Sequence, residues 1–145
     1  MTFRHIVRFR FSYDLSQMGI FKSLFKSAEP KEEKILPWIP LTAVSQLGLI
    51  EEKSKMRPQL IFKHSTRCGI SRMVINQFIE AHDFDQKDFD LYFLDLLSHR
   101  EVSNEVAYKF QVLHESPQLI IVKNGVTVAH ASHGGIHQID LSLFR

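Results

Sequence analysis

The feature that most constrains this chain is the alternation of short apolar runs with helix-patterned segments after residue 35. Runs at 35–41, 59–65 and 89–97 are rich in aromatic and branched residues, a composition typical of strands. Between them, residues 42–55 and 70–82 place apolar side chains three and four positions apart, which is typical of amphipathic helices. Parallel strands need such crossover helices. The order therefore predicts an α/β domain with a mostly parallel sheet.

The last third of the chain changes this pattern. Ser98 and Glu101 form an S-x-x-E sequence, which predicts a helix start with a capping box. Two apolar runs within 116–132 flank Asn124 and Gly125, a strong hairpin signal. We expect a mixed five-stranded sheet, made of parallel strands plus a C-terminal antiparallel hairpin and flanked by helices. A short helix at 137–144 would close the chain.

Local signals refine these elements. Pro37 and Pro40 suit an edge strand because neither can donate to a ladder, and Thr42 is a candidate helix cap. Trp38 is expected to be a core or rim aromatic. The residues that we expect on the buried helix faces are Val44, Leu47, Ile50, Ile70, Met73, Val74, Gln77, Phe78, Ala81, Val102, Val106 and Phe110.

The N-terminal part looks different from the rest. Residues 1–34 are predicted to be an extension and linker, partly flexible, and residues 35–145 the packed domain. Alternation over residues 1–13 is compatible with an added edge strand. Met18 offers a second start, however, which would make 1–17 an extension that the domain does not need.

Composition bounds the partners and the compartment. The net charge is only +2 among 145 residues, so no basic field argues for nucleic acid or an anionic membrane. No apolar run approaches the roughly 18 residues of a membrane span. The single cysteine cannot form an internal disulfide, which favours a reducing compartment. We expect a cytoplasmic protein that binds neither nucleic acid nor membrane.

Cys68 lies where the predicted buried strand at 59–65 gives way to a helix. Unpaired amides and the helix dipole at such a start favour a thiolate, and Arg67 and Arg72 add positive charge. Gly69 leaves room for a disulfide partner to approach. Free cysteines are commonly small buried hydrophobes. Because Thr66, Arg67 and Gly69 are not typical core neighbours, we interpret Cys68 as a reactive thiol.

Ser71 stands three positions after Cys68. A hydroxyl cannot close a disulfide, so a mixed disulfide on Cys68 would need a second thiol from outside to resolve it. A serine in the first turn can also satisfy helix amides. The sequence therefore predicts monothiol rather than dithiol chemistry.

This order of elements resembles the thioredoxin superfamily over residues 35–145. In that family the active-site helix starts at the cysteine, and a cis-proline opening a later strand faces the sulfur. The resemblance implies a cis Ser116–Pro117 bond and a Ser116 backbone that hydrogen-bonds an extended substrate.

The segments HSTRCGIS, SPQLIIVKNG and HASHGG resemble the YtxJ-type monothiol bacilliredoxins of the bacillithiol system. Thr66, Cys68, Ile70 and Ser71 match that motif, while Gly69 stands where proline is common. The resemblance implies an enzyme that removes a small thiol from S-thiolated client proteins through Cys68. Bacillithiol or glutathione would be the co-substrate and a thiol–disulfide reductase a partner, with no bound cofactor or metal.

Two alternatives stay open. The sequence CGIS is also similar to the CGFS motif of monothiol glutaredoxins, which hold a shared [2Fe–2S] cluster with glutathione. Gly134 and Gly135 resemble their glutathione-carboxylate loop, or form only a flexible connection. Arg67 suits a carboxylate of either small thiol. The third possibility is an interaction module with an idle thiol.

The histidines do not predict a metal site. His130, His133 and His137 lie close in sequence but do not follow a structural zinc pattern, so we expect surface histidines. Lys63 and His64 immediately precede the turn that leads to Cys68. His64 is expected to be packed, with a role as proton acceptor only if it faces Cys68.

Overall fold

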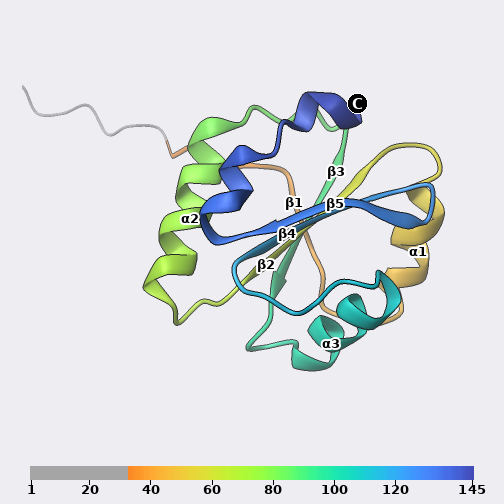
Figure 1. The fold of residues 1–145 in the computed structure, drawn as a ribbon, viewed down its shortest axis with the longest axis horizontal. Coiled ribbons are helices and arrows are strands. Elements are labelled where there is room, and N and C mark those ends of the chain that lie inside the picture. Colours follow the sequence, from red (N-terminus) through yellow and green to blue (C-terminus); the bar gives the residue numbers. More distant parts are fainter. Residues whose placement is uncertain (1–32) are drawn as a thin grey trace, which may run out of the picture. The chain divides into compact units, whose positions relative to one another are not determined.

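The computed structural model of the protein describes residues 33–145, and Lys34–Arg145 form one compact unit (Figure 1). The strand expected at 1–13 and the linker up to residue 32 lie outside the described residues. The helices and strands follow one another in the expected order: β1 (Trp38–Pro40), α1 (Gln46–Lys53), β2 (Gln59–His64), α2 (Gly69–Ala81), β3 (Asp90–Asp95), α3 (Arg100–Lys109), β4 (Gln118–Lys123), β5 (Val126–Ser132) and the 3-10 helices η3 (His133–Gln138) and η4 (Leu141–Phe144).

The five strands form one mixed sheet in the order β1-β3-β2-β4-β5. β1, β3 and β2 run parallel, whereas β4 pairs antiparallel with both β2 and β5. This confirms the predicted fold class. β1 is an edge strand, so the N–H that Pro40 lacks is not needed for a hydrogen bond within the sheet. The strand is three residues long.

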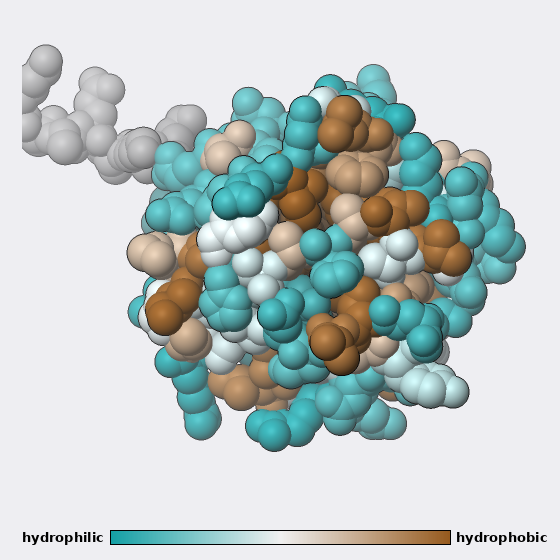
Figure 2. All heavy atoms as spheres, in the orientation of Figure 1, coloured by the Kyte–Doolittle hydropathy of each residue, from teal (hydrophilic) through white to brown (hydrophobic). Residues whose placement is uncertain are grey.

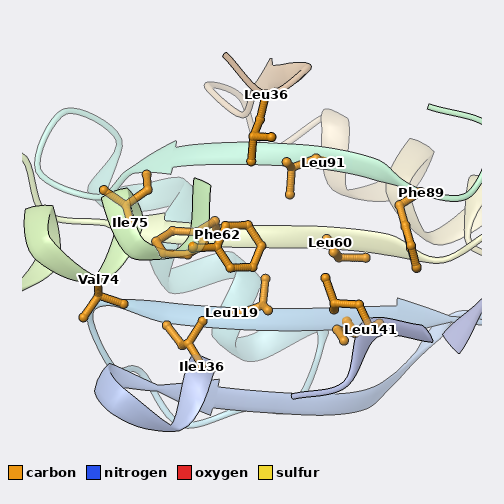
Figure 3. Close-up of a cluster of buried hydrophobic side chains, with 12 residues drawn as sticks. Leu36, Leu60, Phe62, Val74, Ile75, Phe89, Leu91, Leu119, Ile136 and Leu141 are labelled. Carbon is orange, nitrogen blue, oxygen red and sulfur yellow. The ribbon is translucent and has the colours of Figure 1, made fainter. Parts of the chain in front are cut away.

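Helices cover both faces of the sheet (Figure 1), and each face has its own core. α2, η3 and η4 lie over the face to which Leu60 and Phe62 of β2 belong, as Figure 3 shows for much of that cluster. α1 and α3 lie over the other face, with Ile61. Successive side chains of a strand point to opposite faces, so β2 contributes to both cores.

α2 buries a different stripe from the expected one. Val74 and Phe78 are buried as predicted. Trp38 is partly buried and packs against the Phe78 ring with centroids 6.3 Å apart, which agrees with the predicted core or rim aromatic. Ile70 and Met73, however, are 57% and 53% exposed, and Gln77 and Ala81 are exposed too. Since each residue turns the helix by about 100°, a stripe that buries Ser71, Val74, Ile75 and Phe78 leaves these positions outside.

Both predicted capping signals were wrong. α1 begins at Gln46, because Gln46 Oε1 accepts hydrogen bonds from the amides of Thr42 and Ala43 and so closes a turn before the helix. Val44 lies in this turn, 38% exposed. α3 begins after His99, which makes no side-chain cap bond.

The Ser98–Glu101 capping box does not form. Ser98 Oγ instead donates to Asp95 Oδ2 at 2.6 Å. The hydroxyl that the motif offers to the helix amides is thus used at the end of β3. On the buried stripe of α3, Val102 and Val106 are confirmed, and Phe110 directly after the helix is also buried.

The hairpin prediction is confirmed. Asn124 and Gly125 have φ of 54° and 80°, the left-handed conformation that a two-residue hairpin turn requires. The final helix differs from the prediction, because two 3-10 helices replace one helix at 137–144. Asp140 Oδ1 accepts from the Ser142 amide at 2.9 Å, and this cap starts a separate turn at Leu141.

β5 is the other edge strand, and its outer positions are only partly covered. Val126 and Val128 are 60% and 43% exposed, and Figure 2 shows apolar and polar side chains interspersed over the face that contains β5. Among residues 33–145, no helix is long and apolar enough to cross a membrane.

Candidate active site

Four segments meet at one end of the sheet because of the strand register. His64, the last residue of β2, pairs with Asp95, the last residue of β3. Its neighbour Lys63 pairs with Gln118, the first residue of β4, and Gln118 pairs with Ser132, the last residue of β5. The turn to Cys68, the Ser116–Pro117 segment and the start of η3 therefore lie at the same end of the sheet.

Cys68 is the N-cap residue of α2, with φ −100° and ψ 121°. Its amide donates to Ser65 O at 3.1 Å, and its carbonyl accepts from the Arg72 amide at 3.0 Å. The thiol makes no cap bond and is partly exposed. A Cβ placed on Gly69 would meet no heavy atom within 4 Å apart from its chain neighbours, so the position beside Cys68 in the sequence is open.

Ser71 points into the protein and is fully buried. Its Oγ accepts a hydrogen bond from the Ser65 amide at 3.1 Å and lies 2.8 Å from His64 Nδ1. The hydroxyl therefore ties the first turn of α2 to the end of β2. This explains a buried serine on the core stripe, which helical spacing alone did not indicate.

His64 is packed, as expected. It is 7% exposed, and its ring centroid lies 5.6 Å from that of Phe93. Burial is the main cause that lowers the pKa of His64, and the charge of Arg72 acts in the same direction, whereas Asp95 and the Ser71 backbone oppose them. The imidazole is consequently neutral at pH 7.

Asp95 collects the polar groups at the end of β3. It accepts from Ser98 Oγ and from the Leu97 amide, and Thr66 Oγ1 lies 3.5 Å from its Oδ1. Burial acts to raise the pKa of Asp95, but the hydrogen bond from Ser98 and those from the backbone and Thr66 outweigh it and hold the pKa below its usual value. Thr66 thus connects the Cys68 turn to a carboxylate.

The surface around Cys68 combines charge with apolar area. Arg67 and Arg72 are exposed, and Arg72 donates to Thr66 O at 3.4 Å. Ile70 and Met73 are also exposed, one helical turn apart. Helical spacing predicts Met73 in the core, and the structure contradicts that prediction. The i+3 spacing of Met73 from Ile70 was the signal that both could share the outer side of α2.

The Ser116–Pro117 bond is cis, as the resemblance implied. Ser116 Oγ is buried and makes no hydrogen bond within residues 33–145. Pro117 O accepts from the His133 amide at 3.1 Å, so the segment is joined to the start of η3. Gly134 and Gly135 follow His133 directly, and a Cβ on Gly135 would lie 3.6 Å from Ala131 Cβ.

Sequence reasoning missed a second polar cluster at this end of the sheet, on the face that α3 covers. Lys63 is fully buried, and its Nζ lies 2.7 Å from His114 Nδ1. Gln118, also fully buried, bonds the same loop. A charged residue inside an otherwise apolar strand was the one available signal, because lysine is almost never fully buried without a partner.

The residues expected at the site fall into two groups. The register brings Cys68, Ser71, Ser116, Pro117 and the start of η3 to one end of the sheet. The substrate-binding roles expected for these residues, and for Thr66, Arg67, Gly69, Ile70, Gly134 and Gly135, stay predictions. Among the described residues, no three His, Cys, Asp or Glu side chains form a group that could hold a metal ion.

Comparison with known proteins places this geometry in a family. The chain is 33% identical to a solved thioredoxin-fold protein over 68% of this chain and 85% of that one, with a TM-score of 0.58. It also matches the thioredoxins of Malassezia sympodialis (16% identity, 72% and 88% coverage, TM-score 0.58) and Fasciola hepatica (17%, 73% and 98%, 0.55). These two show the fold.

A family model is more specific. The model of the monothiol bacilliredoxin BrxC matches residues 39–141, a range that contains Cys68, the Ser116–Pro117 segment and Gly134–Gly135. Together with the single cysteine and the thioredoxin fold, this match supports a thiol redox function. The chain belongs to the monothiol bacilliredoxin BrxC family.

Proposed function

We propose that the protein removes a low-molecular-weight thiol from mixed disulfides on client proteins, and that this thiol is bacillithiol. The observation that carries this proposal is the pairing of a partly exposed Cys68 at the start of α2 with a Ser71 whose hydroxyl is buried and bonded to His64 and Ser65. One thiol can react, and nothing within the chain can resolve the product.

The exchange balances in two steps. The Cys68 thiolate attacks the small-thiol sulfur of the client disulfide, so that a Cys68–small-thiol disulfide forms and the client sulfur leaves as a thiolate, which takes a proton from solvent. Cys68 is oxidised and the client reduced. A second small thiol or a dithiol reductase then attacks the disulfide on Cys68 and restores its thiolate.

The surroundings of Cys68 support this substrate class. The unpaired amides at the start of α2 favour the thiolate, and Arg67 and Arg72 place two guanidinium groups on the exposed side. Guanidinium groups bind carboxylates through paired hydrogen bonds, and both bacillithiol and glutathione carry carboxylates. Exposed Ile70 and Met73 offer apolar contact to a client.

The test is to incubate the purified protein with a bacillithiolated client and, separately, with a glutathionylated one, and to follow both proteins by intact mass. We expect the client to lose the small thiol and the protein to gain it on Cys68. The control is Cys68→Ser, which should leave the client modified. Clients that stay unchanged with the wild type would refute the proposal.

The same protein tests the cluster-carrier alternative. After anaerobic reconstitution with iron, sulfide and a small thiol, a protein that only exchanges disulfides stays colourless. A brown product with cluster absorbance that Cys68→Ser abolishes would favour the glutaredoxin-like function, because a thiolate at this position is a competent iron ligand.

A further inference from the structure

Lys63 is an unusual residue for the middle of a sheet. It is fully buried on β2, next to Leu94 of β3 and Gln118 of β4. Strand alternation places it on the face of Ile61, under α3, opposite to His64. Burying an ammonium group is costly unless it is hydrogen-bonded, so its partner is informative.

That partner is His114, in the loop between α3 and β4. Lys63 Nζ lies 2.7 Å from His114 Nδ1. A protonated lysine has only donors, so Nδ1 is the acceptor and the imidazole is neutral. Ser103 Oγ of α3 lies 3.5 Å from the same nitrogen. The contact therefore joins the end of β2 to the loop that precedes Ser116.

A second buried side chain fixes the same loop from β4. Gln118 Nε2 donates to Leu113 O at 2.9 Å, and its Oε1 accepts from the Glu115 amide at 3.4 Å. Residues 113–115 are thus tied at three consecutive positions. Ser116 makes no side-chain hydrogen bond of its own within residues 33–145, so these ties hold it from one side, while the bond from the His133 amide to Pro117 O holds it from the other.

We propose that Lys63 is a positioning residue that holds the 113–117 loop, and with it the Ser116 backbone, at the end of the sheet where Cys68 reacts. This inference rests on the proposed function and on the expectation, from the thioredoxin resemblance, that the Ser116 backbone hydrogen-bonds an extended client segment. Lys63 touches no substrate. It acts through His114, which gives the contact a dependence on pH.

The charges around the contact define that dependence. Burial lowers the pKa of Lys63 to about 8. Burial also lowers the pKa of His114, as do the charges of Lys63 and of Arg100 on α3, while Glu115 in the loop opposes them. Below the pKa of His114 its Nδ1 carries a proton and cannot accept, and above about 8 the donor loses its charge. The tie is strongest between these limits.

The kinetic test compares wild type, Lys63→Met and a matched control, Ile61→Met, which changes a buried residue on the same face of the same strand. With a bacillithiolated client at pH 7.4, we expect Lys63→Met to raise KM about tenfold, the effect of one lost charge-assisted hydrogen bond, with kcat within about twofold. Ile61→Met should keep the wild-type KM. An unchanged KM in Lys63→Met would overturn the proposal.

The pH profile separates positioning from general loss of structure. We expect the wild-type KM to rise on the acid side as His114 protonates. His114→Asn places its Oδ1 near the position of Nδ1 and so keeps an acceptor that cannot be protonated. This variant should remove the rise and retain a low KM at pH 7.4. A rise that persists in His114→Asn would contradict the role of this contact.

A third measurement does not depend on the activity. In amide NMR spectra, Lys63→Met should shift or broaden the Ser116 signal, and Ile61→Met should not. If the wild type fails to act on any client, the proposed function is wrong while the NMR result still decides whether Lys63 positions the loop. An unperturbed Ser116 signal would refute the positioning role even in an active enzyme.

Discussion

Two neighbouring residues of β2, His64 and Lys63, hold two different loops at the same end of the sheet. His64 faces α2 and bonds Ser71, which fixes the turn that carries Cys68. Lys63 faces α3 and bonds His114, which fixes the loop that leads to Ser116. Because adjacent side chains of a strand point to opposite faces, one strand end can position both the thiol and the loop expected to bind the client.

The two contacts differ in charge, and this difference indicates which contact contributes to the stability of the fold. The His64–Ser71 pair is neutral, and Ser71 also accepts from the partly buried amide of Ser65. The Lys63–His114 pair requires a buried ammonium. Neutral buried hydrogen bonds stabilise, whereas buried ions are often no better than apolar groups of the same volume. We infer that the first contact serves stability and the second serves function.

The largest expected effect comes from Ser71→Cys, which replaces the partner of His64 with a second thiol. Residues three apart at the start of a helix lie on one side, within reach of a disulfide. The oxidised variant should lose the mass of two hydrogens and release the small thiol without external thiol, as intact mass will show. A variant that keeps the small thiol on Cys68 would mean that the buried position 71 cannot reach it.

Ser71→Ala breaks the His64 contact without adding a thiol. The Ser65 amide and His64 Nδ1 lose their buried partner, so we expect the free energy of unfolding to fall by about 1–3 kcal/mol, measured by urea denaturation. The matched control is Ser103→Ala, a buried serine on the Lys63 side. Among the described residues its hydroxyl makes one long contact of 3.5 Å, with His114 Nδ1. Equal losses in the two variants would contradict the comparison.

Lys63→Met breaks the other contact and should not destabilise the fold at pH 7. We expect the free energy of unfolding to change by between about 0 and +2 kcal/mol. Alkaline pH sharpens the test. Between about 8 and 10.5, the folded and ordinary pKa values of Lys63, the unfolded chain binds a proton that the native state has lost. The free energy of unfolding of the wild type should therefore rise with pH there, and Lys63→Met should lack this rise.

Acid pH tests the His64 side, where the free energy of unfolding depends on pH in the same sense. Because burial lowers the pKa of His64 below 6.5, the unfolded chain takes up a proton that the native state resists. The free energy of unfolding should consequently fall as pH decreases below about 6.5, which urea titrations at pH 5–7 will measure. His114 titrates in the same sense, so the measurement belongs in a His114→Asn background. A flat profile there would contradict the buried, neutral His64.

The smallest effect is expected from Gly69→Pro, which stiffens the Cys68 turn and leaves both contacts intact. Proline is favoured at the first helical position, and the φ and ψ of Cys68 suit a residue before proline. The site is open, so stability should rise by about 0.4–1 kcal/mol in thermal or urea unfolding. Gly125→Ala, at φ 80°, should instead lose about 1 kcal/mol.

The predictions from sequence that failed share one cause. Thr42 and Ser98 were candidate caps, but the Thr42 amide donates to Gln46 Oε1 in a turn before α1, and the Ser98 hydroxyl donates to Asp95 Oδ2. A motif gives a residue's capability, while the neighbours that the fold supplies decide which bond forms. The same holds for Ile70 and Met73, whose spacing fits a core stripe although the sheet lies on the other side of α2.

The sequence by itself determined the order of elements, the hairpin turn and the placement of one thiol at a helix start, because these depend on periodicity, turn chemistry and identity over a few residues. Only the tertiary structure decided that Ser71 faces His64 and that Lys63 meets His114. Those pairs are 7 and 51 positions apart. Their contacts depend on which face of β2 each residue occupies and on the register between strands, and no local pattern in the chain encodes these.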